Sequence, residues 1–167
     1  MIAGPGGPSL NCLLPNKELT LAETSSPVAK LKELVDGIDF AMLTTIRPDG
    51  GLHSCAMATA AIDDDGVVWF FSGSQGQKIE AIKSDSRVNL AYSDSSGQRY
   101  VSISGNAEPV RDHVKAKQLW SPLYSTWFPK GIEDPNLILL KVRVRGAEYW
   151  DGGVGCMVRL SGFAKQP

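Results

Sequence analysis

A series of short β-type runs separated by glycine-containing turns constrains this fold more than any other feature of the sequence. Residues 40–46 and 52–62 flank a turn at 47–51 (RPDGG), in which proline presets φ and Asp-Gly accepts a tight backbone. Similar turns at 63–66 (DDDG) and 94–97 (DSSG) separate the runs that follow. Tight turns join antiparallel strands, whereas parallel strands need long crossovers. The sequence therefore predicts a mainly β chain built from hairpins.

About six strands are expected, at residues 40–46, 52–62, 67–71, 88–92, 100–107 and 137–145. Short helices are expected from Pro27 to about Gly37, over residues 77–83, and after Asp112, where Ala116, Leu119, Trp120 and Leu123 would share one face. Few helices fall between strands, which disfavours a parallel βαβ sheet. We predict an antiparallel barrel with helical covers.

The domain organisation follows from composition along the chain. Residues 1–27 contain four prolines and no clear period, so we expect a loosely structured N-terminal extension, followed by one domain at 28–167. The tail at 152–167 has a spacing compatible with either a strand or a loose helix.

Charge and cysteine content exclude several function classes. Lys+Arg 17 against Asp+Glu 18 gives a net charge of −1, with no basic excess for nucleic acid or an anionic membrane. The three cysteines are far apart and no metal-ligand spacing occurs, so neither a metal site nor a disulfide framework is expected. The N-terminus lacks a signal-peptide pattern and no run reaches transmembrane length. A reducing cytoplasm is the expected location.

The stretch from Val67 to Tyr92 carries a possible anion site. We expect Ser72, Gly73, Ser74 and Gly76 to leave backbone N–H groups free to point at a ligand just before the helix at 77–83, and helix N-termini attract phosphate. Lys78 in the first helical turn opposes the helix dipole unless an anion is bound there. The alternative is an unoccupied turn with a solvated lysine. Neither GxxxxGK[ST] nor GxGxxG is present.

Four separated motifs carry a family resemblance: DDDGVVWFFSGSQGQK, YVSISGNAEPVRD, WFPKGIEDPN and AEYWD. In this order they resemble the general stress protein branch of the pyridoxamine 5′-phosphate oxidase-like FMN-binding split barrels. The resemblance covers residues from about 28 to the C-terminus. It implies a six-stranded antiparallel split β-barrel, a homodimer, and FMN held at the dimer interface.

The resemblance also implies a cofactor-binding set. Phe71 and Ser72 fall where the family ends a strand against the flavin, and Gln77 and Lys78 match its phosphate-binding pair. A position near Tyr100 lies close to the flavin in relatives, and Trp150 is similar to the aromatic terminus that reaches the partner subunit's site. The full expected set is Phe71, Ser72, Ser74, Gln77, Lys78, Tyr100 and Trp150.

Departures from the family pattern bear on affinity and activity. Relatives commonly read SRPMATQ where residues 54–60 read SCAMATA, so Cys55 replaces an arginine and Ala60 a polar side chain. Gln77 replaces a second arginine. Each lost charge-assisted contact costs about 1.5–3 kcal/mol, which predicts weak FMN binding. The family's true oxidases carry Arg-x-His near the C-terminus, and no histidine follows His113 here. Pyridoxamine 5′-phosphate oxidase activity is therefore not expected.

We interpret the chain as an FMN-binding general-stress-type protein and a flavin-dependent oxidoreductase of unknown substrate. No residue stands out as a catalytic acid, base or nucleophile. A non-catalytic dimeric split barrel that has lost flavin is the alternative, and a barrel for deazaflavin or haem is a third, with His53 the available histidine. Trp120, Trp127 and Phe128 are interpreted as packing residues, although so aromatic a loop is also compatible with a pocket wall.

Overall fold

A closed antiparallel barrel forms the body of the molecule. The structure is a computed structural model and describes residues 26–151, 155–160 and 162–163. The strands are β1 (Phe40–Ile46), β2 (Leu52–Ile62), β3 (Val67–Gly73), β4 (Arg87–Asp94), β5 (Arg99–Val110), β6 (Leu137–Asp151) and β7 (Cys156–Leu160). Their order is β3-β2-β1-β4-β5-β6-β7, and β3 also pairs with β6, which closes the first six strands into a barrel. The expected six-stranded antiparallel split barrel is confirmed.

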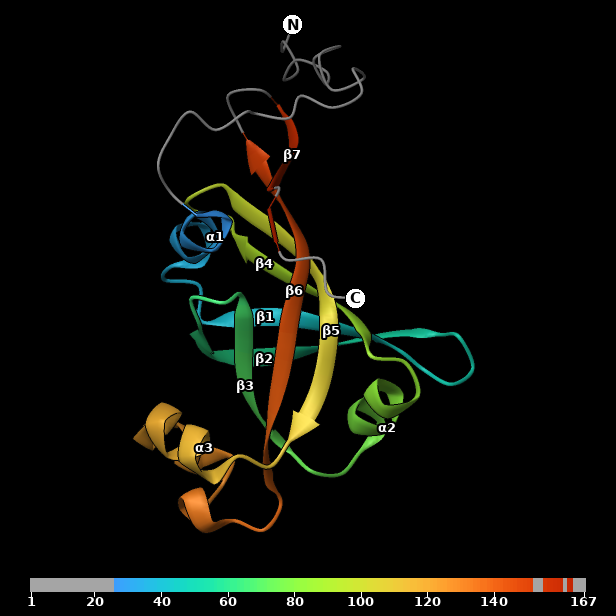
Figure 1. The fold of residues 1–167 in the computed structure, drawn as a ribbon, viewed down its shortest axis with the longest axis vertical. Coiled ribbons are helices and arrows are strands. Elements are labelled where there is room, and N and C mark those ends of the chain that lie inside the picture. Colours follow the sequence, from blue (N-terminus) through green and yellow to red (C-terminus); the bar gives the residue numbers. More distant parts are fainter. Residues whose placement is uncertain (1–25, 152–154, 161, 164–167) are drawn as a thin grey trace, which may run out of the picture.

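The long strand β6 pairs with three neighbouring strands. Its first half pairs with β3, its second half pairs with β7, and β5 runs beside it across a register shift between Ser104 and Gly105. Figure 1 shows β6 crossing the whole barrel, with β7 beside its far end. The strand at 156–160 settles the tail in favour of β structure for those residues. The expected extension at 1–27 lies outside the described residues except for Ser26 and Pro27.

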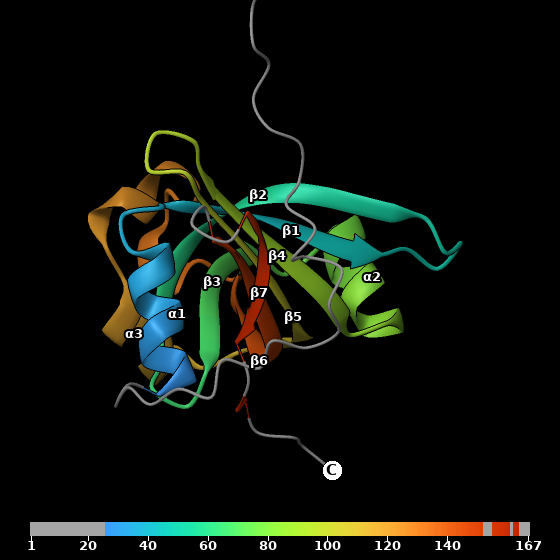
Figure 2. The same cartoon turned by 90° about the horizontal axis from the view of Figure 1, so that it is seen from above.

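Three short α-helices cover the barrel. Helix α1 (Pro27–Val35) is capped by the Ser26 hydroxyl, which accepts the Ala29 N–H at 3.1 Å, and it buries Leu31 and Val35. Helix α2 (Gln77–Ser84) follows β3, and α3 (His113–Leu119) follows β5. Two 3-10 turns, η2 (Pro122–Thr126) and η3 (Gly131–Glu133), lead into β6. In Figures 1 and 2, α2 and α3 lie on opposite sides of the barrel.

Helix α3 is shorter than the hydrophobic spacing predicts. It ends at Leu119, and Leu123 is 76% exposed instead of lying on the buried face. Pro122 explains the difference, because the residue before a proline is disfavoured in the α conformation. The chain therefore turns into η2 one turn earlier than expected.

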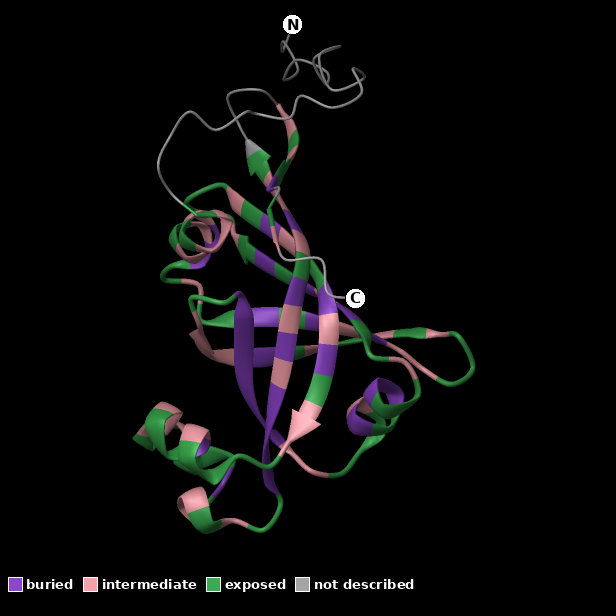
Figure 3. Ribbon diagram, viewed as in Figure 1, coloured by how far each residue is buried: buried purple, intermediate pink, exposed green. Residues whose placement is uncertain are grey.

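Strand β3 is buried on both faces. Val68 and Phe70 point into the barrel core, while Val67, Trp69 and Phe71 belong to a second cluster with Ala116 of α3, Phe128, Leu137 and Leu139. Figure 3 shows β3 buried almost throughout its length. The second cluster seats α3 and the η2 turn against the end of β3, where the candidate site lies.

Candidate functional site

A cavity of about 520 Å³ opens where β3 ends and α2 begins. Its walls come from the start of β1, the middle of β2, the end of β3, the first turn of α2, and the segment from η2 to β6. The lining residues are Phe40, Ala56, Met57, Ala58, Phe71, Ser72, Gly73, Lys78, Tyr124, Trp127, Phe128, Asp134 and Asn136. Three residues of the expected cofactor set, Phe71, Ser72 and Lys78, therefore meet in one cavity.

Lys78 brings a poorly partnered cation into this cavity. Its side chain is half-buried, and its Nζ lies 3.1 Å from the Met57 Sδ, a thioether that is only a weak acceptor. Among the described residues, no carboxylate forms an ion pair with it. Burial lowers the pKa of the Lys78 ammonium below its ordinary value, while the electrostatic effect of the nearby Cys55 sulfur acts in the opposite direction. Such a site favours an incoming anion.

The backbone beside Lys78 is less open than the sequence suggests. The N–H of Ser74 donates to the Asn136 carbonyl at 2.7 Å, so the expectation that this N–H is free is wrong. Ser72 and Gly73 lie within the β3–β6 ladder, opposite Ile138 and Leu137. The glycine turn indicates an earlier end for β3. In the structure, β6 pairs with β3 as far as Gly73, the last residue of β3.

The other expected cofactor residues lie outside the cavity lining. Gln77 is the exposed first residue of α2, beside Lys78. Tyr100 and Trp150 are each 39% exposed and lie on the outer surface of β5 and β6. Within one chain the structure therefore places the expected residues in two groups, one at the cavity and one on the outer sheet surface.

The aromatic wall of the cavity, formed by Phe71, Tyr124, Trp127 and Phe128, was only partly predicted from the sequence. The Tyr124 ring is tilted against the Phe71 ring, with ring centroids 4.4 Å apart, and Trp120 meets Phe71 edge-on at 5.6 Å. Trp120 and Phe128 pack in the second cluster as interpreted, and Phe128 also lines the cavity together with Trp127. The WFPKGIEDPN motif was the available signal for this wall. Met57 carried no signal, because its role depends on the position of Lys78.

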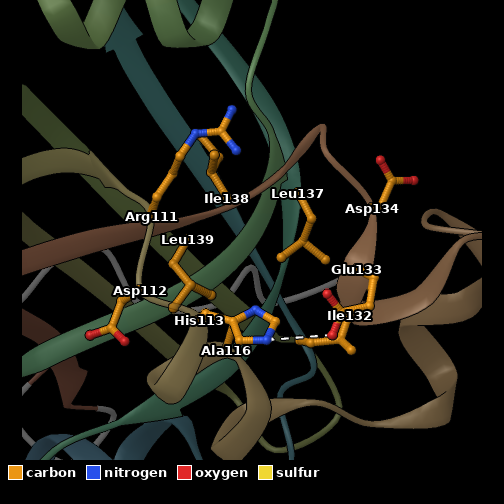
Figure 4. Close-up of a pocket in the computed structure, with 10 residues that line it drawn as sticks. All are labelled: Arg111, Asp112, His113, Ala116, Ile132, Glu133, Asp134, Leu137, Ile138 and Leu139. Carbon is orange, nitrogen blue, oxygen red and sulfur yellow. Dashed lines mark ion pairs between the residues drawn. The ribbon is translucent and has the colours of Figure 1, made fainter.

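A second cavity of about 190 Å³ lies beneath α3 and shares Asp134 with the larger one. Figure 4 shows His113 pointing toward Glu133, with its Nε2 3.4 Å from the carboxylate. The Arg111 guanidinium donates to the Pro135 carbonyl at 3.1 Å. These contacts join α3 and β5 to the η3 segment. In the described part of the chain, no cluster of three or more His, Cys, Asp or Glu residues is placed to hold a metal ion.

Comparison with known proteins identifies the family. The family model described as "Pyridoxamine 5′-phosphate oxidase like" matches residues 26–166. The chain belongs to this family. The match confirms the resemblance seen in the motifs, and it includes every residue that lines the larger cavity.

Individual known proteins are also similar to this chain. Protein bli-3 of Neurospora crassa is 29% identical over 120 residues, which are 66% of this chain and 57% of that protein, so the chain spans little more than half of its length. A general stress FMN/FAD binding protein from Xanthomonas citri is 27% identical, with a TM-score of 0.63 over 83% of this chain and 95% of that chain.

A second similar structure shares the fold. It is a protein related to general stress protein 26 from Clostridium acetobutylicum, with 20% identity and a TM-score of 0.69 over 80% of this chain and 94% of that chain.

At the positions where this chain departs from the family pattern, Cys55 packs against the barrel core and Ala60 against the second cluster. No helix in the described part of the chain is long and apolar enough to cross a membrane.

Proposed function

We propose that this protein is a homodimeric FMN-binding member of its family that acts as a flavin-dependent oxidoreductase, with the flavin phosphate held at Lys78. The observation that carries the proposal is the half-buried Lys78 ammonium, which faces a cavity and has a thioether as its acceptor. A phosphate is the kind of group that completes such a cation's hydrogen bonds. The similar Xanthomonas citri protein, described as FMN/FAD binding, supports the choice of flavin.

The remaining walls suit the other parts of FMN. Ser72, Gly73 and Asn136 line the same cavity as Lys78 and offer polar groups, and Phe71 and Tyr124 offer aromatic surface for a planar ring. Bound FMN would supply the redox chemistry, while the chain binds and orients it. Burial by the aromatic wall would exclude water from one side of the ring.

The outer surface of the barrel supports a dimer. Paired residues on neighbouring strands project on the same face. Ala56, Met42, Ala91 and Ser102 are paired in register across β2, β1, β4 and β5. Beside them, Ser93 pairs with Tyr100 and Trp150 pairs with Met157. The large apolar side chains on these outward-facing strand positions, Phe40, Tyr100, Trp150 and Met157, are 39–50% exposed, which supports an interaction surface.

A dimer would also explain why the expected residues fall into two groups. Phe40 and Ala58 belong both to this outer face and to the cavity lining, so the cavity opens at the edge of the face. Two copies related by a twofold axis would bury the same face on each. We propose that Tyr100 and Trp150 of one subunit approach the cavity of the other.

The test is an FMN titration followed by flavin fluorescence and the visible spectrum. We expect Lys78→Met to weaken binding by about tenfold or more, the scale of one charge-assisted contact. Lys83→Met is the matched control, because Lys83 lies on the same helix, is exposed and does not line the cavity. Wild-type protein that stays colourless at high FMN would reject the proposal and favour a flavin-free dimeric binding module.

A further inference from the structure

Trp127 is exposed although it lines the larger cavity. Its side chain is 57% exposed, whereas its neighbour Phe128 and the facing Phe71 are 8% and 7% exposed. Trp127 therefore presents a large apolar ring at the mouth of the cavity while the rings behind it are buried. An exposed tryptophan in a cavity wall gains from covering by a ligand.

Trp127 continues a row of aromatic rings. Its backbone N–H donates to the Tyr124 carbonyl at 3.1 Å, and its ring centroid lies 6.5 Å from that of Tyr124. The Tyr124 ring is tilted against the Phe71 ring, with centroids 4.4 Å apart. The row thus runs from the buried Phe71 to the exposed Trp127, so a ligand that stacks on Trp127 extends an aromatic surface that is already in place.

Lys78 and Asp134 are the charged residues of the described cavity lining. Lys78 is the proposed partner of the flavin phosphate, so the described lining offers no second cation to another anionic ligand. A ligand that stacks on Trp127 therefore suits this cavity best as a planar ring without negative charge.

We infer that Trp127 forms a subsite for a second ligand, an uncharged planar aromatic compound that stacks at the mouth of the cavity. This inference rests on the proposed function for the flavin as the first ligand. It narrows the substrate class from unknown to uncharged aromatic molecules, and it makes Trp127 a specificity-determining residue.

The experiment measures binding of 2-naphthol by calorimetry, with and without saturating FMN. The saturated analogue decahydro-2-naphthol has the same carbon skeleton but cannot stack. We expect 2-naphthol to bind at least about tenfold more tightly than the analogue, and Trp127→Leu to lose that preference. Trp127→Phe should keep most of the affinity. Leu123→Ala is the control, because Leu123 is exposed on the same turn and does not line the cavity.

The outcomes separate this inference from the proposed function. If FMN fails to bind but 2-naphthol still depends on Trp127, the flavin proposal falls and the aromatic subsite stands. Competition between 2-naphthol and FMN would overturn the second subsite and assign Trp127 to the flavin ring. Unchanged binding in Trp127→Leu would overturn the inference, as would a change of this variant from dimer to monomer in sedimentation, which would make Trp127 an interface residue.

Discussion

Lys78 concentrates the electrostatics of the candidate site in one side chain. A half-buried ammonium has lost part of its hydration, and the Met57 thioether replaces little of it. The lowered pKa of Lys78 records this cost, which arises mainly from burial. An anion at this point would restore the lost interactions and raise the pKa again.

FMN affinity should therefore fall as the pH rises through the lowered Lys78 pKa, at a lower pH than for a solvated lysine. Titrations should stay above about pH 7, where the flavin phosphate is largely a dianion. Lys78→Arg should remove the alkaline loss, because arginine keeps its charge. If Lys78→Arg lost FMN affinity over the same pH range as the wild type, a group other than Lys78 would be responsible for the pH dependence.

Unfolding of the ligand-free protein should show the opposite trend. Between the lowered folded pKa and the ordinary unfolded pKa of Lys78, the unfolded state binds more protons. The contribution of Lys78 to the free energy of unfolding should therefore rise with pH in that window.

The residues of the site differ in how far the sequence could predict them. Lys78, Phe71 and Ser72 follow from a strand, a glycine turn and a helix that are adjacent in the chain. Trp127 and Asn136 reach the cavity through a long connection, and local pattern does not say where such a segment folds back. The hydrogen bond from Ser74 to Asn136 was unpredictable for the same reason.

At the scale of elements, the β5–β6 pair controls how the barrel closes. The register shifts between Ser104 and Gly105, where β6 passes from its β3 partner toward β7. A Cβ at Gly105 would lie 2.5 Å from the Arg143 carbonyl oxygen. Glycine is required here by the close approach of another backbone.

Gly105→Ala should destabilise the protein by about 2–3 kcal/mol, because the clash is with backbone and cannot be relieved by a rotamer change. Gly146→Ala is the matched control on the facing strand, where a Cβ would meet only the Ser104 hydroxyl at 3.3 Å. Urea unfolding of both variants checks this. Equal midpoints for Gly105→Ala and the wild type would contradict the account of the register shift.

The helical cover beside the site is held by charge as well as by packing. Lys115 of α3 donates to the Asp63 carboxylate at 2.8 Å and lies over the Trp69 ring, and the Trp69 indole donates to the same carboxylate at 2.7 Å. Although burial raises the pKa of Asp63, these hydrogen bonds lower it overall. These contacts hold α3 against the barrel, and the chain segment that follows α3 supplies Tyr124, Trp127 and Phe128 to the aromatic wall.

For the whole molecule, turn chemistry and the family resemblance together were enough to predict the barrel. Hairpins at 47–51, 63–66 and 94–97 leave few ways to arrange the strands, and family motifs fixed the closure. The length of β6 and the early end of α3 were missed, because a strand that changes partners and a proline-terminated helix depend on tertiary context. The association of two copies is a property of the outer surface, which sequence pattern alone does not define.

Met42→Lys should convert the proposed dimer to a monomer. Met42 is 44% exposed and lies between Ala56 and Ala91 on the outer face, so a dimer would bury the new charge without a partner. Val114→Lys is the control, because Val114 is 69% exposed on α3, away from this face. Sedimentation of both variants distinguishes them, and a dimeric Met42→Lys would place the interface elsewhere.

The most direct test of the site compares the Kd of FMN with that of riboflavin, which lacks the phosphate. In the wild type we predict that FMN binds at least about tenfold more tightly, and that Lys78→Met removes most of this difference by weakening FMN alone. If FMN and riboflavin bind the wild type equally, or if Lys78→Met weakens both to the same extent, Lys78 does not hold a phosphate and the proposed flavin site is wrong.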